Sequence, residues 1–190
     1  MPSSILDLLP APEPFGALAV LAGCCVGLMP RRNLLLMASA LCSSLFCIHF
    51  LRLGSTTGAA MCAISLLQSL AATRIADGAR PAWLGGFFAA TSGLAVALTL
   101  ATWAGWPSAL AGTGALLAAA ARLQADMRRM RLLLLACSLC WVGHNLIVGS
   151  VSGLMCDILS ITSLLAALWG YRETAPRTAA VPRTAGLSPV

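Results

Sequence analysis

Residues 42–72 read CSSLFCIHFLRLGSTTGAAMCAISLLQSLAA, and residues 137–167 read CSLCWVGHNLIVGSVSGLMCDILSITSLLAA. Aligned at an offset of 95 positions, the two segments are identical at 11 of 31 places. The identities include the two histidines of the chain, His49 and His144, and a Gly-Ser-x-x-Gly motif in each segment. Such residues seldom align by chance at one offset, so we interpret the pair as an internal repeat. A repeat of this kind predicts a molecule built from two related halves.

The composition is typical of a membrane protein. Hydrophobic residues make up 59% of the chain and charged residues 9%, whereas soluble domains contain about 25% charged residues. At roughly 20 apolar residues per transmembrane helix, a chain of 190 residues can supply about seven spans. The net charge of +6 comes entirely from arginine. The topology of a membrane protein accounts for the excess of arginine without a nucleic-acid partner. We therefore expect the chain to interact with a lipid bilayer and not with nucleic acid.

Seven apolar stretches, bounded by Pro, Gly or Arg, predict seven transmembrane helices. The first and fifth stretches are short and rich in glycine, but each directly precedes a repeated segment and they therefore correspond to one another. The stretches are 14–29, 33–51, 56–73, 82–102, 107–121, 132–148 and 152–171.

The arginines test this division, because cytoplasmic loops collect positive charge. With seven spans, all arginines except Arg52 fall on one side of the membrane. Omitting the first or the fifth span would destroy this sorting. We therefore predict a multi-pass protein with its N-terminus outside the cell and its C-terminus in the cytoplasm.

The predicted fold is an all-α membrane protein of two parallel three-helix bundles joined by a linker helix. The bundles cover residues 14–74 and 107–171, and the linker, 82–102, must cross the membrane for the second half to repeat the orientation of the first. Residues 1–13 are predicted to be a short extracytoplasmic N-terminus and residues 172–190 a disordered cytoplasmic tail. Parallel repeats of this kind occur in secondary transporters.

Polar side chains within spans are functional candidates, because they are costly to bury in lipid. Asp157 is the one acidic residue well inside a predicted span, and Cys62 is its counterpart in the first half. Both histidines and two deep aromatic residues lie in the same outer part of the spans. The candidate substrate-binding set is His49, His144, Asn145, Asp157, Trp141, Phe46 and Arg52.

Two interpretations of this set remain open at the level of sequence. A carboxylate near imidazoles can exchange protons or bind a cationic or polyhydroxylated solute. Alternatively, Arg52 or a histidine neutralises Asp157, and the aromatic pair serves ordinary helix packing. Five further polar residues either line the inner half of a solute path or mediate helix contacts: Ser65, Gln68, Ser160, Thr162 and Ser163.

Cysteine motifs raise a separate hypothesis. Thiolates with an imidazole suit soft metal ions, so Cys24-Cys25 and Cys137-x-x-Cys140 suggest soft-metal transfer. Cysteine is also a small apolar residue suited to tight helix packing, and we predict no bound metal or cofactor. The segment from Gly149 to Gly153 has Val151 where a nucleophile elbow requires serine. We therefore expect no enzymatic activity.

The second and sixth stretches carry a family resemblance. The series Arg31-Arg32 through His49-Phe50, and Gln124-x-Asp126-x-Arg128-Arg129 through Trp141-x-x-His144-Asn145 before Gly149-Ser150, resembles the bacterial inner-membrane YgjV family. This resemblance implies an inner-membrane location.

The 3+1+3 layout is further similar to that of the SWEET sugar transporters and the PnuC vitamin transporters. The function we predict is transport of an unidentified small solute between the two bundles. A non-transporting scaffold or regulatory protein is the alternative, and homo-oligomerisation is left open.

Overall fold

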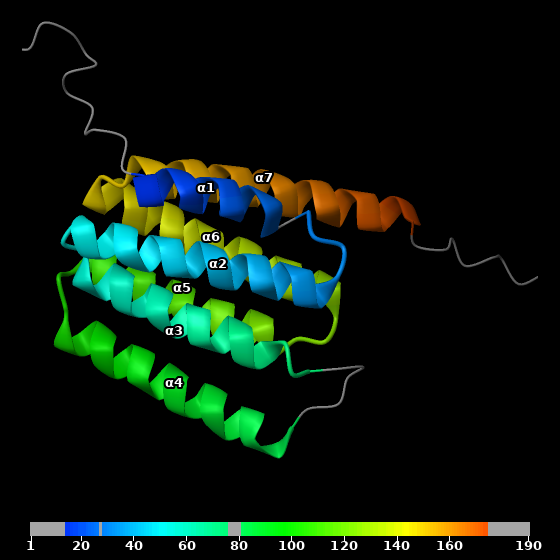
Figure 1. Ribbon diagram of the computed structural model, residues 1–190, viewed down its shortest axis with the longest axis horizontal. Helices are drawn as coiled ribbons and strands as arrows, with labels where there is room; N and C mark the ends of the chain where they lie inside the picture. Colours follow the sequence, from blue (N-terminus) through cyan, green and yellow to red (C-terminus); the bar gives the residue numbers. More distant parts are fainter. Residues whose placement is uncertain (1–13, 27, 76–80, 175–190) are drawn as a thin grey trace, which may run out of the picture.

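The computed structural model describes residues 14–26, 28–75 and 81–174, and these residues form seven α-helices (Figure 1). Each helix lies within a few residues of its predicted span, apart from α6, which begins five residues early. The predicted termini 1–13 and 175–190 lie outside the described residues. The helices are α1 (Pro14–Val26), α2 (Arg32–Arg52), α3 (Thr56–Ala72), α4 (Ala82–Ala101), α5 (Trp106–Arg122), α6 (Met127–Val148) and α7 (Val151–Thr174).

Helix length separates four of the described helices from the other three. By length and composition, α2, α4, α6 and α7 can each cross a membrane, whereas α1 and α3 are shorter apolar helices and α5 has 17 residues. The 17 residues of α3 extend about 26 Å at 1.5 Å per residue, slightly less than the thickness of a typical hydrocarbon core. Helix α7 continues to Thr174, so residues 172–174, predicted as part of the tail, extend the last helix instead.

Six of the described helices form two layers, and the seventh lies at one edge (Figure 1). One layer contains α1, α2 and α3, and the other contains α7, α6 and α5. Neighbours within each layer are in contact, and the layers meet where α1 packs on α7 and α3 packs on α5. Helix α4 contacts α3 and α5. Consecutive helices run in opposite directions, so α1 and α5 are parallel, as are α2 and α6, and α3 and α7.

The two ends of the bundle differ in chemistry. We call the end with the α2–α3 and α6–α7 turns the turn end, and the opposite end the arginine end. Both turns contain a glycine in the left-handed region, Gly54 at φ 77° and Gly149 at φ 71°, where other residues are strained. In each turn the following serine donates its N–H to a carbonyl five residues back: Ser55 to Phe50 (2.9 Å) and Ser150 to Asn145 (3.0 Å).

The outward surface of the bundle differs from that of a soluble protein. Large apolar side chains cover the outward surface of the bundle, among them Leu21, Leu51, Leu100 and Leu139, each exposed over at least 60% of its area. Polar side chains are instead buried in the interior. Since a bilayer solvates apolar surface and penalises polar groups, this arrangement fits a lipid environment.

Candidate functional site

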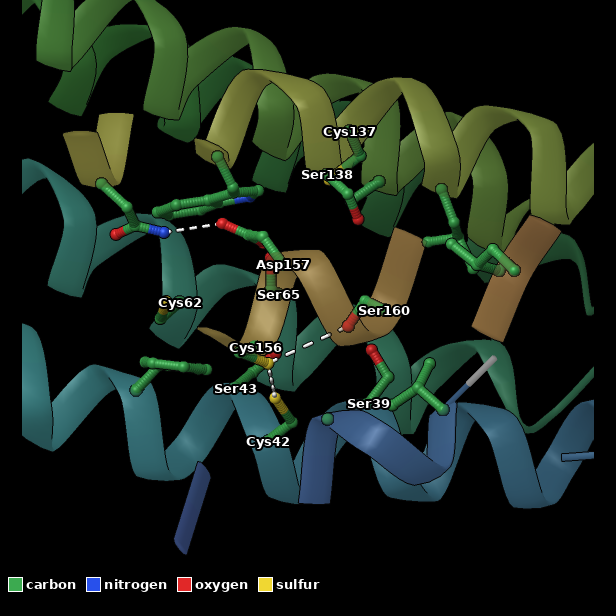
Figure 2. A pocket seen from close by; sticks show the side chains of 18 of the residues that line it. Ser39, Cys42, Ser43, Cys62, Ser65, Cys137, Ser138, Cys156, Asp157 and Ser160 are labelled. Atoms are coloured by element: carbon green, nitrogen blue, oxygen red, sulfur yellow. Dashed lines mark hydrogen bonds between the residues drawn. The ribbon is translucent and has the colours of Figure 1, made fainter. Parts of the chain in front are cut away.

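A cavity of about 130 Å³ lies between the two helix layers (Figure 2). It has room for several water molecules but is smaller than the 300–1,000 Å³ typical of pockets for drug-sized ligands. Its lining comes from α1, α2, α3, α5, α6 and α7: Gly23, Val26, Ser39, Cys42, Ser43, Phe46, Phe50, Cys62, Ser65, Ala118, Arg122, Leu134, Cys137, Ser138, Trp141, Asn145, Cys156, Asp157, Ser160 and Leu164.

The lining residues follow the 95-position offset that aligns residues 42–72 with residues 137–167. Of the 20 described residues around the cavity, 16 form eight pairs separated by 95 positions. The two helix layers therefore contribute corresponding positions to opposite walls. The pairs are Gly23/Ala118, Ser39/Leu134, Cys42/Cys137, Ser43/Ser138, Phe46/Trp141, Phe50/Asn145, Cys62/Asp157 and Ser65/Ser160.

Asp157 and Asn145 form the most polar part of the lining. Asn145 Nδ2 donates a hydrogen bond of 2.7 Å to Asp157 Oδ2, and both side chains are at least nine-tenths buried. Asn145 Oδ1 is also buried, and no described group donates to it. Gly153 makes room for this amide, because a Cβ at position 153 would clash with the Asn145 side chain. The pair thus presents a carboxylate beside an unpartnered acceptor.

The two histidines lie beyond this pair, toward the turn end, and each bonds to the opposite half. His49 Nε2 lies 3.0 Å from Ser150 Oγ, and His144 Nε2 lies 3.4 Å from Ser55 Oγ. His144 Nδ1 is also 2.9 Å from the carbonyl oxygen of Pro107. The two halves therefore exchange His–Ser hydrogen bonds at corresponding positions.

Aromatic rings fill the space between the histidines and the cavity. Phe50 is stacked on both Phe46 and Trp141, with centroid distances of 5.7 Å in each case. The edges of His49 and His144 approach the same cluster, with His144 5.4 Å from Phe50. Stacked and edge-to-face rings at these distances stabilise one another. Phe46, Phe50 and Trp141 thus form an aromatic part of the cavity lining.

Arg122 lies on the cavity wall toward the arginine end. Its side chain is 3% exposed, its Nε donates to Ser69 Oγ (2.8 Å), and its Nη1 donates to Gln68 Oε1 (3.3 Å). Gln68 in turn donates to Thr91 Oγ1 at 2.9 Å. Within the described residues, the side chains that anchor the guanidinium are therefore neutral.

Two further arginines tie helices together at the arginine end. Arg32, at the start of α2, donates to the carbonyl oxygens of Ala72 (2.8 Å) and Arg122 (2.6 Å), which end α3 and α5. Arg131, near the start of α6, donates to the Met29 carbonyl oxygen at 3.5 Å, just after α1. Cations at helix C-termini also interact favourably with the helix dipole. Each layer thus binds a helix end of the other layer.

The structure separates the predicted site residues into three groups. Asp157, Asn145, Trp141 and Phe46 line the cavity. His49 and His144 do not line it but bond to Ser150 and Ser55 near the turn end. Arg52 is exposed, and its guanidinium lies 5.6 Å from the ring centroid of Phe15; the hydrogen-bond partner of Asp157 is Asn145. Of the other predicted polar residues, Ser65 and Ser160 line the cavity, and Ser163 and Thr162 bond to carbonyls of their own helix.

Arg122 was not among the predicted site residues, because its position at the end of a span assigned it to the cytoplasmic surface. One signal in the sequence points inward. Side chains of a helix lean toward its N-terminus, so an arginine ending α5 extends back along the helix. The residues before it, Ala118 to Ala121, are all alanine and leave space for the guanidinium.

The cysteines do not assemble into a metal centre in the described part of the chain. Among residues 14–26, 28–75 and 81–174, no three His, Cys, Asp or Glu side chains gather closely enough to hold a metal ion. Cys42 and Cys156 are free thiols whose sulfur atoms lie 4.0 Å apart across the cavity. The cysteines around the cavity act there as small, weakly polar lining groups.

An apolar exterior, a polar interior and several membrane-length helices define a polytopic membrane protein. Within that class, the chain belongs to the YgjV family of bacterial inner membrane proteins, whose sequence profile matches residues 11–175. No curated protein and no solved structure shows significant similarity to the chain. The protein is therefore a multi-pass protein of the bacterial inner membrane.

Proposed function

We propose that the protein is a carrier or facilitator that moves a small solute across the inner membrane through the central cavity. The observation that carries this proposal is the lining of the cavity, in which eight pairs of residues at matching positions, several of them polar, face one shared space. A path between two related units is the arrangement that repeat-built secondary transporters use. In a scaffold, nothing requires a polar cavity to be kept at this junction.

The architecture in this proposal is seven spans in a 3+1+3 layout like that of the SWEET and PnuC transporters. Two observations support it. The contact between α1 and α7 has a counterpart in the contact between α5 and α3, as expected if α1–α3 and α5–α7 are equivalent units. Corresponding helices also run in the same direction, and α4 supplies the crossing needed for this.

The proposed orientation has the arginine end in the cytoplasm and the turn end outside. Within the described segments, Arg31, Arg32, Arg74, Arg122 and the three arginines at the start of α6 are at the arginine end, whereas Arg52 is at the turn end. Positive charge accumulates on the cytoplasmic side of membrane proteins. The histidines and aromatic rings then close the cavity toward the outside.

The proposed carrier includes a solute-occluding state in which both ends of the cavity are closed. The His–Ser bonds and stacked rings close the turn end, and the arginine ties hold the helix ends together at the other end. Transport requires each closure to open in turn. Because each closure consists of bonds between the layers, small movements of one layer relative to the other would break it.

The test is the accessibility of a cavity thiol to a membrane-impermeant methanethiosulfonate reagent. A variant that retains only Cys137, which lines the cavity, is labelled in inside-out and right-side-out vesicles. A carrier exposes Cys137 to the reagent from at least one side, and a thermally stabilising solute from a screen slows the labelling. The matched control retains only Cys47, which does not line the cavity. Protection of Cys137 from both sides would instead favour a scaffold.

A further inference from the structure

We infer that the cavity binds a small zwitterion, with the ammonium group at Asp157 and the carboxylate group toward Arg122. This inference rests on the carrier function proposed above, because it takes the cavity as the solute site. It assigns a chemical class to the solute, which the fold alone does not.

The first argument is that two opposite charges line one cavity without neutralising each other. Asp157 accepts a hydrogen bond from the neutral amide of Asn145, and Arg122 donates to the neutral groups of Ser69 and Gln68. Buried charges are costly unless they are paired. A zwitterion supplies to each the counter-charge that no residue in the described part of the chain provides.

The second argument is position. Asp157 bonds to the last turn of α6 near the turn end, whereas Arg122 is the final residue of α5 at the arginine end. On α7 the lining extends from Cys156 to Leu164, about 12 Å at 1.5 Å per residue. The two charges therefore lie toward opposite ends of an elongated space. Hydroxyl groups of Ser65, Ser138 and Ser160 lie along it (Figure 2).

The third argument concerns the groups around the carboxylate. An ammonium group has three N–H donors and needs several acceptors. Asp157 provides its carboxylate, and Asn145 Oδ1 is a buried acceptor that no described group satisfies. A buried carbonyl oxygen without a donor is unfavourable in the empty site. An ammonium held between Asn145 and Asp157 would satisfy it.

Size and charge exclude other solute classes from this arrangement. A cavity of about 130 Å³ is too small for a nucleotide or a disaccharide. A simple cation would pair with Asp157 but leave Arg122 buried without a counter-ion, and a simple anion would do the reverse. A small molecule with both charges is complementary to both ends.

The experiment is a ligand series measured by thermal stabilisation and calorimetry on the purified full-length protein. The zwitterions are glycine, β-alanine, 4-aminobutanoate and 5-aminopentanoate, which separate the two charges by one to four methylene groups. Each is compared with the amine and the carboxylate of the same chain length. We expect one zwitterion to bind about tenfold to a hundredfold more tightly than its matched amine or carboxylate, because each charge-assisted bond contributes separately.

Two variants locate the charges, each with a control that makes the same charge change at an exposed position. With Asp157→Asn, the zwitterion should no longer bind more tightly than the matched carboxylate. With Arg122→Gln, it should no longer bind more tightly than the matched amine. The controls are Asp126→Asn, which keeps a capping side chain at the start of α6, and Arg128→Gln. Both controls should bind the zwitterion as the unaltered protein does. If a cavity variant does not fold, the ligand series on the unaltered protein still shows whether a zwitterion binds more tightly than its matched amine and carboxylate.

The outcomes separate this inference from the carrier function. Equal binding of a zwitterion and its amine, or no binding of any zwitterion, would overturn the inference, even if another solute is transported in proteoliposomes. If a zwitterion binds as expected but is not transported, the site is correct and the carrier function is wrong.

Discussion

His49 and His144 lie 95 positions apart, and each bonds to the serine that follows the glycine turn of the other half. The cavity-lining residues at matched positions of the two halves are less similar. Where the second half has Asp157 hydrogen-bonded to Asn145, the first half has Cys62 and Phe50 at the matched positions. The halves thus agree in the bonds that close the turn end and differ in the groups that face the cavity.

This difference indicates separate constraints on closure and on binding. Each half must supply one member of each His–Ser bond. Both halves therefore need a histidine and a serine at these positions. A charge inside a membrane is costly, so one carboxylate in the cavity suffices and a second would repel it. At the position matched to Asn145, Phe50 instead stacks on Trp141 and contributes an apolar ring to the lining.

The largest expected effect comes from giving the first half the charge of the second. Cys62→Asp places a second carboxylate in the cavity, where the matched neighbour Phe50 provides no donor. An unpaired buried charge costs about 3–5 kcal/mol, so unfolding in detergent should occur at a much lower temperature than for the control Cys62→Ser. A midpoint equal to that of the control would show that water reaches position 62 freely.

The second prediction compares Gly153 and Gly58, the glycines that follow each turn. In Gly153→Ala the new methyl group would clash with the Asn145 amide, whereas in Gly58→Ala it would lie 2.8 Å from Ser55 Oγ and 3.1 Å from His144 Nε2. Overpacking typically costs about 1–3 kcal/mol. We expect Gly153→Ala to approach the upper value and Gly58→Ala the lower, measured by thermal unfolding. The reverse order would mean that the Asn145 amide moves aside more readily than His144.

Most helix boundaries could be predicted from sequence because they have a local cause, but α6 begins at Met127, five residues before the predicted start of its span. Long apolar runs between Arg, Pro and Gly define the spans, and Gly54 and Gly149 mark the turns. Even the short α1 and α5 could be predicted, because each directly precedes one of the two similar segments, 42–72 and 137–167. The end of α7 was placed three residues early, at Tyr171, since the change in composition that marks the tail precedes the end of the helix.

The site could be predicted only in part, because its contacts depend on packing between layers. Asp157 could be predicted as a site residue, because an acidic side chain inside a span is costly to bury in lipid. Its partner could not be deduced, and the structure has Asn145, from the preceding helix, where the sequence suggested Arg52 or a histidine. Nor does spacing show that His49 bonds to Ser150 of the other half, because a helical pattern does not specify which helices become neighbours.

The third prediction concerns the two serines of the His–Ser bonds. Ser150 Oγ lies 3.0 Å from His49 and also accepts the Gly153 N–H at 3.1 Å, which caps α7. Ser55 lies 3.4 Å from His144 and makes no side-chain cap for α3. Loss of a hydrogen bond and a cap costs about 2 kcal/mol, so Ser150→Ala should lower the unfolding midpoint more than Ser55→Ala. Equal shifts would contradict the difference between the two bonds.

The smallest expected effect comes from making the aromatic pair identical. Trp141 stacks on Phe50 at an interplanar angle of 18°, and Phe46 stacks on the same Phe50 ring at 26°. Phenylalanine at position 141 retains this stacking but has a smaller ring, so Trp141→Phe should cost about 1 kcal/mol. The smaller ring also enlarges the cavity and should speed the labelling of Cys137. Trp83→Phe, at an exposed site on α4, is the control. If Trp141→Phe left the labelling rate unchanged, the rings would not be what closes the turn end, and the His–Ser bonds alone would have to do so.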